Sequence, residues 1–273
     1  MMEYYPREPD NALKPYIETL FYLNDYCPDH TKERLVPDGS TNLIIELDNQ
    51  ERFIYDNESS EIKQSCRVAW ISGMHREFIT ISSIPKTKLI AVRFLPGGGF
   101  PFFQISLDRL TNQVVDASAI FGEAIVNLRA EIRDIDDPEA KLDELEGFLL
   151  QLLVEHGPPP KWITEAVLAL KTSPSRTRLE KLIEGSHYSQ KHFISSFKKY
   201  VGLRPKELQR ILRFAEVIPN IHDAGSINWA QLVSDCGYYD QSHFIKDFQR
   251  FSGFNPQEFF KAGHDRINFF VSE

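Results

Sequence analysis

The sequence lacks the features of several large protein classes. It has 3 cysteines in 273 residues, Cys27, Cys66 and Cys236, which are unclustered and odd in number. That pattern argues against a disulfide framework and suits a reducing compartment. No stretch approaches the roughly 18 apolar residues of a membrane helix, and residues 1–10 have no apolar core. We therefore expect a cytoplasmic protein without a membrane span or a signal peptide.

Groups suited to metal binding or catalysis are sparse in the N-terminal half. Its histidines are His30, His75 and His156, widely spaced, whereas a metal site needs clustered histidine and carboxylate ligands. Neither Cys27 nor Cys66 has a nearby histidine-and-acid pattern that would mark a nucleophile. The sequence predicts no metal, no cofactor and no catalytic residues, so we do not expect an enzyme.

The net charge of −8 is unevenly distributed along the chain. Residues 158–273 contain 16 Lys and Arg against 12 Asp and Glu, a balance of +4. Residues 1–157 contain 15 against 27, a balance of −12. Such an asymmetry is expected when only one half of a protein meets phosphate.

One segment occurs twice near the C-terminus, 51 positions apart. Residues 188–208 and 239–259 are identical at 9 of 21 aligned positions, where chance would give about one or two. In each copy a capping residue, Ser189 or Asp240, opens a helix whose apolar residues recur every three or four positions. A shorter helix precedes each, and Gly237 breaks the chain between the helices of the second copy. The pattern predicts two helix-turn-helix units.

Other residues mark the remaining helices of this region. Thr177 is the expected N-cap of the first short helix, and Asn228 is the expected N-cap of the corresponding helix in the second unit. Between the units, Pro205 to about Val217 reads as one longer spacer helix.

The stretch Cys236-Gly-Tyr-Tyr-Asp-Gln-Ser-His-Phe and the Phe-(x)4-Gly-Phe-(x)-Pro that follows resemble the C-terminal domain of AraC/XylS-type transcription regulators. The resemblance covers about Lys161–Ala262. It departs at His187, where the first turn of that family often has glycine. The resemblance implies a sequence-specific regulator that binds double-stranded DNA, with RNA polymerase as a further partner if it is an activator.

The expected DNA contacts lie opposite the apolar stripes of the second helix in each unit. Amide and ammonium groups bond base edges in the major groove, serine adapts, and isoleucine can meet a thymine methyl. The expected base readers are Gln190, Lys191, Ile194, Ser195, Gln241, Ser242, Ile245 and Lys246. The expected phosphate contacts, each of which could equally be part of a solvated face, are Lys198, Lys199, Arg204, Arg213 and Arg250.

Residues 1 to about 122 read as mostly β. Short β-rich runs at 43–47, 52–55, 68–71, 78–81 and 89–94 alternate with turns, which predicts a small barrel or sandwich. Its position resembles that of the cupin-like sensor domains of AraC-type regulators. The phrases at 37–43 and 94–98 also resemble an uncharacterised N-terminal domain of such regulators. The glycines of 97–99 form either a structural turn or an anion cradle.

The expected fold class is α+β with two domains. A β-rich domain spans 1–122, a helical connector 123–156, a proline-rich linker 157–160 and the double helix-turn-helix domain 161–273. The connector includes a helix from Pro138 to Val154 with an apolar stripe. That stripe either packs on its own domain or meets a second subunit in a homodimer.

Three functions remain open from the sequence. In the first, the β-rich domain binds a small-molecule effector and alters DNA binding; Trp70, Phe78 and Arg93 are candidate pocket residues, although strand register is not set by sequence. In the second, that domain only dimerises or binds a protein partner. In the third, it is a catalytic domain fused to a DNA reader. Alkyl-transfer repair, known in some relatives, would need clustered cysteines that this sequence lacks.

Overall fold

The computed structural model describes residues 2–155, 157–222, 229–238, 240–261 and 269–271. The strands are β1 (Glu3–Arg7), β2 (Ile17–Tyr26), β3 (Lys32–Leu35), β4 (Thr41–Glu46), β5 (Arg52–Tyr55), β6 (Ile62–Cys66), β7 (Ala69–Ser72), β8 (Ile79–Ser82), β9 (Thr87–Phe94), β10 (Val114–Asp116) and β11 (Phe269–Val271). The helices of the N-terminal part are α1 (Phe100–Phe103), the 3-10 helix η1 (Leu107–Leu110), α2 (Ser118–Phe121), α3 (Glu123–Asp134) and α4 (Pro138–Glu155). Those of the C-terminal part are α5 (Lys161–Thr172), α6 (Leu179–Gly185), α7 (Gln190–Val201), α8 (Pro205–His222), α9 (Trp229–Asp235), α10 (Gln241–Ser252) and α11 (Pro256–Lys261).

Two antiparallel sheets form the N-terminal domain. One has the order β1-β2-β9-β4-β7-β10 and the other β11-β3-β8-β5-β6. The five strands expected from sequence are present as β4, β5, β7, β8 and β9, with ends shifted by a residue or two. Short or charged strands such as β3, with the sequence KERL, carry too little apolar alternation to be read from sequence. The predicted α+β fold, an antiparallel β domain followed by a helical domain, is confirmed.

The larger sheet is apolar on both faces. On β4, Leu43 and Ile45 belong to a core with the helices α3 and α4, whereas Ile44 belongs to a separate cluster on the inner face. Strand β9 pairs with β4 in register, so Ile44 lies opposite Ala91 and both point inward. Because side chains alternate along a strand, one face is closed by helices and the other is turned toward the second sheet.

The apolar stripe of α4 packs within its own domain. Leu142, Leu145 and Leu149 are completely buried, and the ring of Phe148 lies 5.7 Å from that of Phe121. Among the residues that the structure describes, none of the exposed large hydrophobic side chains belongs to α4. The stripe therefore gives no reason of its own to place a dimer contact on this helix.

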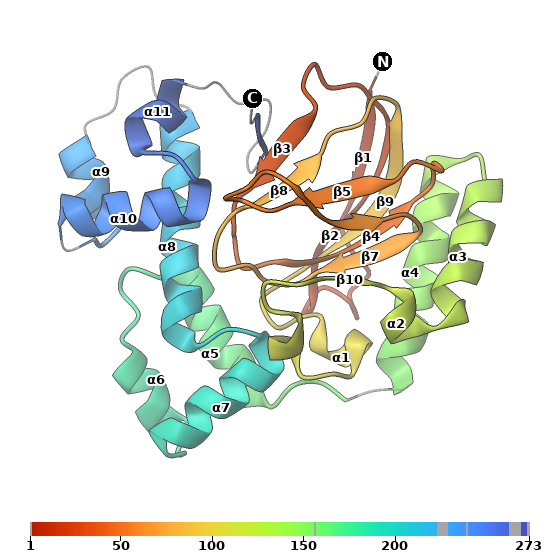
Figure 1. Ribbon diagram of the computed structural model, residues 1–273. Coiled ribbons are helices and arrows are strands. Elements are labelled where there is room, and N and C mark those ends of the chain that lie inside the picture. Colours follow the sequence, from red (N-terminus) through yellow and green to blue (C-terminus); the bar gives the residue numbers. More distant parts are fainter. Residues whose placement is uncertain (1, 156, 223–228, 239, 262–268, 272–273) are drawn as a thin grey trace.

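The C-terminal domain consists of two helix-turn-helix units joined by α8. Units α6–α7 and α9–α10 lie near opposite ends of α8 (Figure 1). This spacer is longer than predicted, since it continues past Val217 to His222 and includes Pro219. Phe214, Val217 and Ile218 are buried along it. Packing of this apolar face offsets the cost of a proline inside the helix.

Most expected caps and turns are present. The Ser189 side chain accepts from His192 N at 3.3 Å, and Asp240 accepts from His243 N at 2.7 Å. Gly237 has a φ of +69° two residues after the end of α9, and His187 adopts +59° two residues after the end of α6. A non-glycine residue therefore takes the left-handed conformation there, at some cost in strain.

The expected role of Thr177 as an N-cap is wrong. Its hydroxyl donates to the carbonyl oxygens of Ala169 at 2.9 Å and Ser173 at 2.7 Å, so it closes the end of α5. Arg178 occupies the N-cap position of α6 without a side-chain hydrogen bond to the helix. Asn228, the other expected cap, lies outside the described residues.

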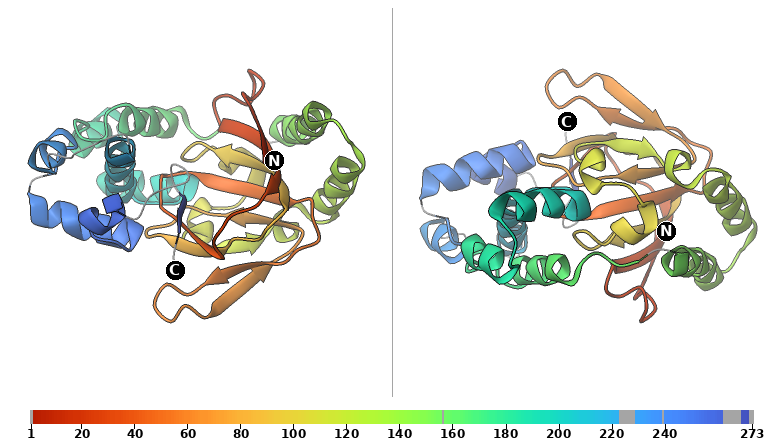
Figure 2. Two further views of the ribbon diagram at one scale, coloured as in Figure 1. Left: turned by 90° about the horizontal axis from the view of Figure 1, so that it is seen from above. Right: turned by 90° about the horizontal axis from the view of Figure 1, so that it is seen from below.

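The β-sheets lie between the double helix-turn-helix domain on one side and α3 and α4 on the other (Figures 1 and 2). Val36 and Met74, from loops of the β domain, are buried in the same hydrophobic cluster as the helices of the C-terminal domain. The C-terminal core is thus completed by the N-terminal domain. Among the described residues, no helix combines the length and apolar character needed to cross a membrane.

Candidate nucleic-acid interface and internal cavity

The outer face of α7 carries the side chains expected to read bases. Gln190, Lys191 and Ser195 are exposed and Ile194 is half-buried, whereas Phe193 on the inner face is fully buried. The apolar stripe therefore fixes the rotation of the helix, and the polar residues face outward.

Helix α10 presents a matching face. Gln241, Ser242 and Lys246 are exposed, and Phe244 is buried. Ile245 is also exposed, at 39% of its surface, although it is apolar. A large apolar side chain left in solvent between polar neighbours suits contact with a base edge.

The expected phosphate contacts fall into two groups. Lys199, Arg204 and Arg250 are exposed. In contrast, Lys198 Nζ lies 3.6 Å from Asp108 Oδ2 on η1. Arg213 Nη1 donates to the Gly237 carbonyl at 3.1 Å, so Arg213 is engaged within the second unit.

A buried ion pair that the sequence did not reveal joins α8 to α10. Asp247 is 1% exposed and accepts two hydrogen bonds from Arg210, from Nε at 3.2 Å and from Nη2. The bond to Asp247 holds the pKa of Arg210 above its ordinary value. The sequence signal was an acidic residue three positions after Phe244, on the face of the helix that is otherwise apolar.

A cavity of about 470 Å³ lies between the two sheets of the N-terminal domain. Its walls come from the inward positions of β2, β3, β4, β5, β7, β8 and β9. The middle is apolar and includes Phe21, Ile44, Trp70, Ile81 and Leu89. Pockets of this size and character commonly hold small organic ligands.

One polar end of the cavity lies toward the helical domain. Arg93 donates from Nε to Glu18 at 2.7 Å and from Nη2 to Asp38. Nearby, His75 Nε2 lies 3.0 Å from the hydroxyl of Ser72. Burial lowers the pKa of His75 to about 4, so this imidazole is neutral near pH 7.

The other polar end is acidic. The hydroxyl of Ser83 donates to Glu33 Oε1 at 2.7 Å, and Trp70 Nε1 donates to Glu46 Oε1 at 3.2 Å. Arg52 Nη2 lies 2.6 Å from Asp48 Oδ2 and 3.0 Å from Glu46 Oε2. Burial raises the pKa of Glu46 to about 7, although Arg52 opposes the shift.

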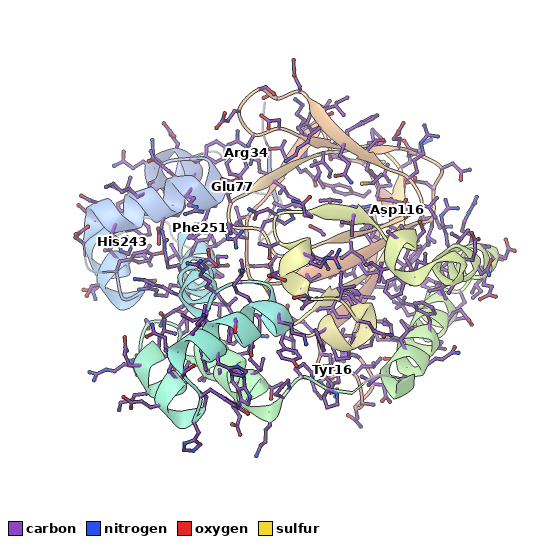
Figure 3. The ribbon with its side chains drawn as sticks, turned by 60° about the horizontal axis from the view of Figure 1, so that its bottom comes forward. Tyr16, Arg34, Glu77, Asp116, His243 and Phe251 are labelled. Atoms are coloured by element: carbon purple, nitrogen blue, oxygen red, sulfur yellow. The ribbon has the colours of Figure 1, made fainter. Side chains whose placement is uncertain are left out.

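Two of the three candidate pocket residues line the cavity, and the third does not. Trp70 and Arg93 line the cavity. Phe78 does not; its ring stacks at 4.7 Å on the guanidinium of Arg34, which lies where the sheet meets the C-terminal helices (Figure 3). The charged pair of Glu46 and Arg52 was missed, because inward-facing charges on strands are visible only once the register is known.

The triple glycine is a packed turn. Gly97 has a φ of +78°, and a Cβ at Gly98 would lie 1.9 Å from the Tyr16 carbonyl oxygen. A Cβ at Gly99 would lie 2.5 Å from the ring of Phe103. These close approaches require glycine for packing, which favours the structural interpretation over an anion cradle. Within the described part of the chain, no three His, Cys, Asp or Glu side chains are grouped to hold a metal.

The β domain contacts the first unit and the spacer directly. The Thr111 hydroxyl donates to the Gly202 carbonyl at 2.6 Å, and the rings of Phe100 and Tyr200 lie 4.6 Å apart. On the spacer, Glu207 pairs with Arg76 at 3.0 Å.

The second unit is also docked. The Arg34 guanidinium lies 4.5 Å from the ring of Phe254, just after α10. Gly253 allows this approach, since a Cβ there would lie 2.7 Å from Phe78 Cε1. Strand β11 pairs with β3 on the same edge, with Phe270 opposite Arg34. Both units are therefore held against the sheets of the N-terminal domain.

Comparison with known proteins gives two family matches. Residues 6–116 match the family described as a domain of unknown function, DUF6597. Residues 182–262 match HTH_18, described as a helix-turn-helix domain. No curated protein sequence matches the chain.

Comparison with solved structures gives matches of low sequence identity and low TM-score. An apo variant of ToxT from Vibrio cholerae strain SCE256 is 11% identical, with 93% of this chain and 98% of that chain covered and a TM-score of 0.47. ToxT from Vibrio cholerae O395 is 11% identical, with 95% and 96% covered and a TM-score of 0.43. ToxT of strain SCE256 with a bound unsaturated fatty acid is 11% identical, with 95% and 94% covered and a TM-score of 0.38.

The helix-turn-helix match begins within α6 and covers α7, the spacer α8 and the second unit. In both units the second helix has a buried aromatic stripe and an exposed polar face. The chain therefore carries an AraC-type helix-turn-helix domain behind a DUF6597 domain, and it is a DNA-binding transcription regulator.

Proposed function

We propose that a small molecule held in the internal cavity changes how the two recognition helices meet DNA. One observation carries the proposal: Val36 lines the cavity and is also buried in the core of the helix-turn-helix domain. A ligand that displaces Val36 must therefore disturb the packing of the C-terminal helices, since close-packed cores transmit small shifts.

The turn after Val36 supports the same route. Gly39 lines the cavity and lies so close to α8 that a Cβ there would approach Leu208 Cδ1 to 3.0 Å and Leu212 Cδ2 to 3.4 Å. Cavity wall and spacer helix are thus neighbours without an intervening layer.

A chain of ion pairs also connects the cavity wall to the helical domain. Arg93 on the cavity wall binds Glu18, and Glu18 also pairs with Lys171 of α5 at 3.1 Å. The Lys171 contact is largely exposed, so it contributes little energy. The carboxylate of Glu18 nevertheless links Lys171 of α5 to Arg93 of the cavity wall.

For DNA, we propose that the exposed faces of α7 and α10 read bases in adjacent major grooves, with Lys199, Arg204 and Arg250 on phosphates. Exposure of these residues supports these roles. Lys198 joins them when its pair with Asp108 opens. A homodimer and a contact with RNA polymerase remain expectations, which sedimentation and transcription assays test.

A filled interior would favour the alternative function, in which the N-terminal domain only dimerises or binds a protein. The cavity of about 470 Å³ favours the sensor instead.

The proposal is tested by measuring the DNA affinity of the full chain with and without a heat-treated small-molecule extract of the source cells. The extract should change the Kd of the wild type. It should not change that of Ala91→Phe, which fills the cavity from β9, while Ala130→Phe on the exposed face of α3 keeps the response. An extract that leaves the wild-type Kd unchanged argues for the interaction module.

A further inference from the structure

The acidic end of the cavity has more acidic than basic side chains on its wall. Glu33 and Glu46 line it, with exposures of 3% and 1%, and Asp48 lies beside them. Arg52 is the cation on the wall at this end, and it is shared between Asp48 and Glu46. His30 also contacts Glu33, with its Nε2 atom 3.0 Å from Oε1. The other ring nitrogen of His30 lies 3.0 Å from Asp29 Oδ1, so this imidazole is shared between two carboxylates.

Two polar atoms at this end lack hydrogen bonds. Glu46 Oε2 and Arg52 Nη1 are both buried and receive or donate no hydrogen bond in the described structure. Oε2 does lie 3.0 Å from Arg52 Nη2, close enough for ionic attraction, but without the geometry of a hydrogen bond. Since buried polar groups are nearly always paired, these atoms point to a missing partner.

The hydrogen bonds of Glu33 are unequally divided between its two carboxylate oxygens. The hydrogen bonds from Tyr26, His30 and Ser83 all go to Oε1. Its second oxygen receives none of them. Each of these two wall carboxylates therefore has one oxygen that receives none of the side-chain hydrogen bonds described here.

The rest of the cavity wall indicates what kind of group the remainder of the ligand would be. Beyond the acidic end the wall is formed by Phe21, Ile44, Trp70, Ile81 and Leu89. Aromatic and branched aliphatic walls favour an apolar group, and an ammonium beside them is further stabilised by an aromatic face.

We propose that the cavity binds an organic cation, an apolar body with a protonated amine, whose ammonium donates to Glu46 and Glu33. This inference rests on the proposed sensor function and names its ligand class. A hydroxyl or carbonyl oxygen beside the amine would accept from Arg52 Nη1.

The same charges disfavour an anionic ligand. A carboxylate at this end would face Glu33 and Glu46 and would share one arginine that already has two partners. Like charges at short range in a buried site are costly. A neutral alcohol would fill the space without relieving the excess of negative charge.

The test uses the full chain and a matched set of hexylamine, hexanol and hexanoate, followed by calorimetry and thermal unfolding. Hexylamine should bind about tenfold or more tightly than hexanol, and hexanoate more weakly than hexanol. Glu46→Gln and Glu33→Gln should each remove most of the preference for the amine over hexanol, whereas Glu131→Gln, on the exposed face of α3, should keep it. A cooperative thermal unfolding transition in each variant shows that its fold is intact.

The outcomes separate this inference from the proposed function. Hexanol or hexanoate binding as tightly as hexylamine, or no binding by any of the three, overturns the organic cation. If the extract still changes the DNA affinity in that case, the sensor function stands. If hexylamine binds with the expected preference but the extract leaves the DNA affinity unchanged, the ligand class stands and the sensor function fails.

Discussion

At the scale of single residues, burial separates charges that are accessible from solvent from charges that act in the interior. Lys191 is exposed on a recognition helix, so its ammonium is free to meet a base. Arg52 is 5% exposed, so its charge acts within the β domain. The same chemical type thus has different roles according to the side of the fold on which it lies.

Changing Lys191→Ala or Gln241→Ala should relax base preference at one position of the site. Loss of one base contact costs on the order of 1–3 kcal/mol of discrimination. Lys199→Ala should instead weaken all sequences alike, because phosphates carry no sequence information. Selection from random duplex DNA measures both effects. Recovery of the wild-type site by the first two variants would show that other residues read the bases.

Glu46 should make the protein less stable as pH rises. Its folded-state pKa of about 7 lies above the ordinary 4.5, so the folded state holds the proton more tightly. The resulting stability is fully present below about pH 4.5 and is lost as pH rises through 7, with a loss of up to roughly 3 kcal/mol. The groups around the side chain are Arg52, Asp48, Trp70 and Cys66, and Arg129 binds its backbone oxygen.

Urea unfolding of wild type and Glu46→Gln at about pH 5 and pH 8 measures this effect. The variant should lose less stability between the two pH values than the wild type does. Glu131→Gln, on the exposed face of α3, is the control and should behave as wild type. Equal losses in wild type and Glu46→Gln would contradict the raised pKa.

At the scale of elements, the spacer α8 and the recognition helix α10 are joined by the Arg210–Asp247 pair. The equivalent position in the first unit is Ser196, whose hydroxyl lies 3.3 Å from His192 Nε2 within α7. The repeat therefore conserves the apolar stripe but not the polar link. Only the second recognition helix is fixed to the spacer by this ion pair.

Asp247→Ala should destabilise the protein by about 3 kcal/mol, at the lower end for a broken buried pair because Arg210 is 28% exposed. Ser196→Ala, at the equivalent position of α7, should cost less than about 1 kcal/mol. Chemical denaturation of both variants gives the comparison. Similar losses for the two substitutions would mean that the ion pair contributes no more than an ordinary hydrogen bond.

The length of α8 should set the spacing of the DNA contacts. Two recognition helices on one domain are expected in successive major grooves, roughly 34 Å apart on one face of the duplex. Footprinting with the full chain should show two protected segments about 10 base pairs apart. One short protected segment would mean that a single unit engages DNA.

At the scale of the whole molecule, the two domains share structure that neither completes alone. Val36 and Met74 are buried among the C-terminal helices. Thr111, Arg76 and Arg34 each contact a different part of the helical domain. DNA-binding measurements therefore belong on the full chain, because a fragment starting near 158 would expose the surface that these residues cover.

Opening the contact between η1 and α7 should strengthen DNA binding. Asp108→Asn removes the carboxylate that holds Lys198, so this lysine becomes available to a phosphate. One added phosphate contact should steepen the slope of log affinity against log salt by about 0.9. Glu131→Gln makes the same change in net charge far from the helical domain and should leave the slope unchanged. An unaltered slope in Asp108→Asn would show that Lys198 does not reach DNA.

The sequence by itself determined the features that depend on local interactions. The apolar spacing around Phe244 and the caps Ser189 and Asp240 follow from neighbours within a few residues. The double helix-turn-helix domain and the α+β class were accordingly predictable. So were the exposed faces of α7 and α10, because burial of one face of a helix leaves the opposite face outside.

Only the tertiary structure decided where the β domain keeps its charges and its empty space. Glu33, Glu46 and Arg52 come from three strands that pair with different neighbours, and a shift of one residue in any register would turn a charge outward. The double role of Val36 likewise depends on how two domains pack. Such contacts join residues far apart in the chain, and no local pattern records them.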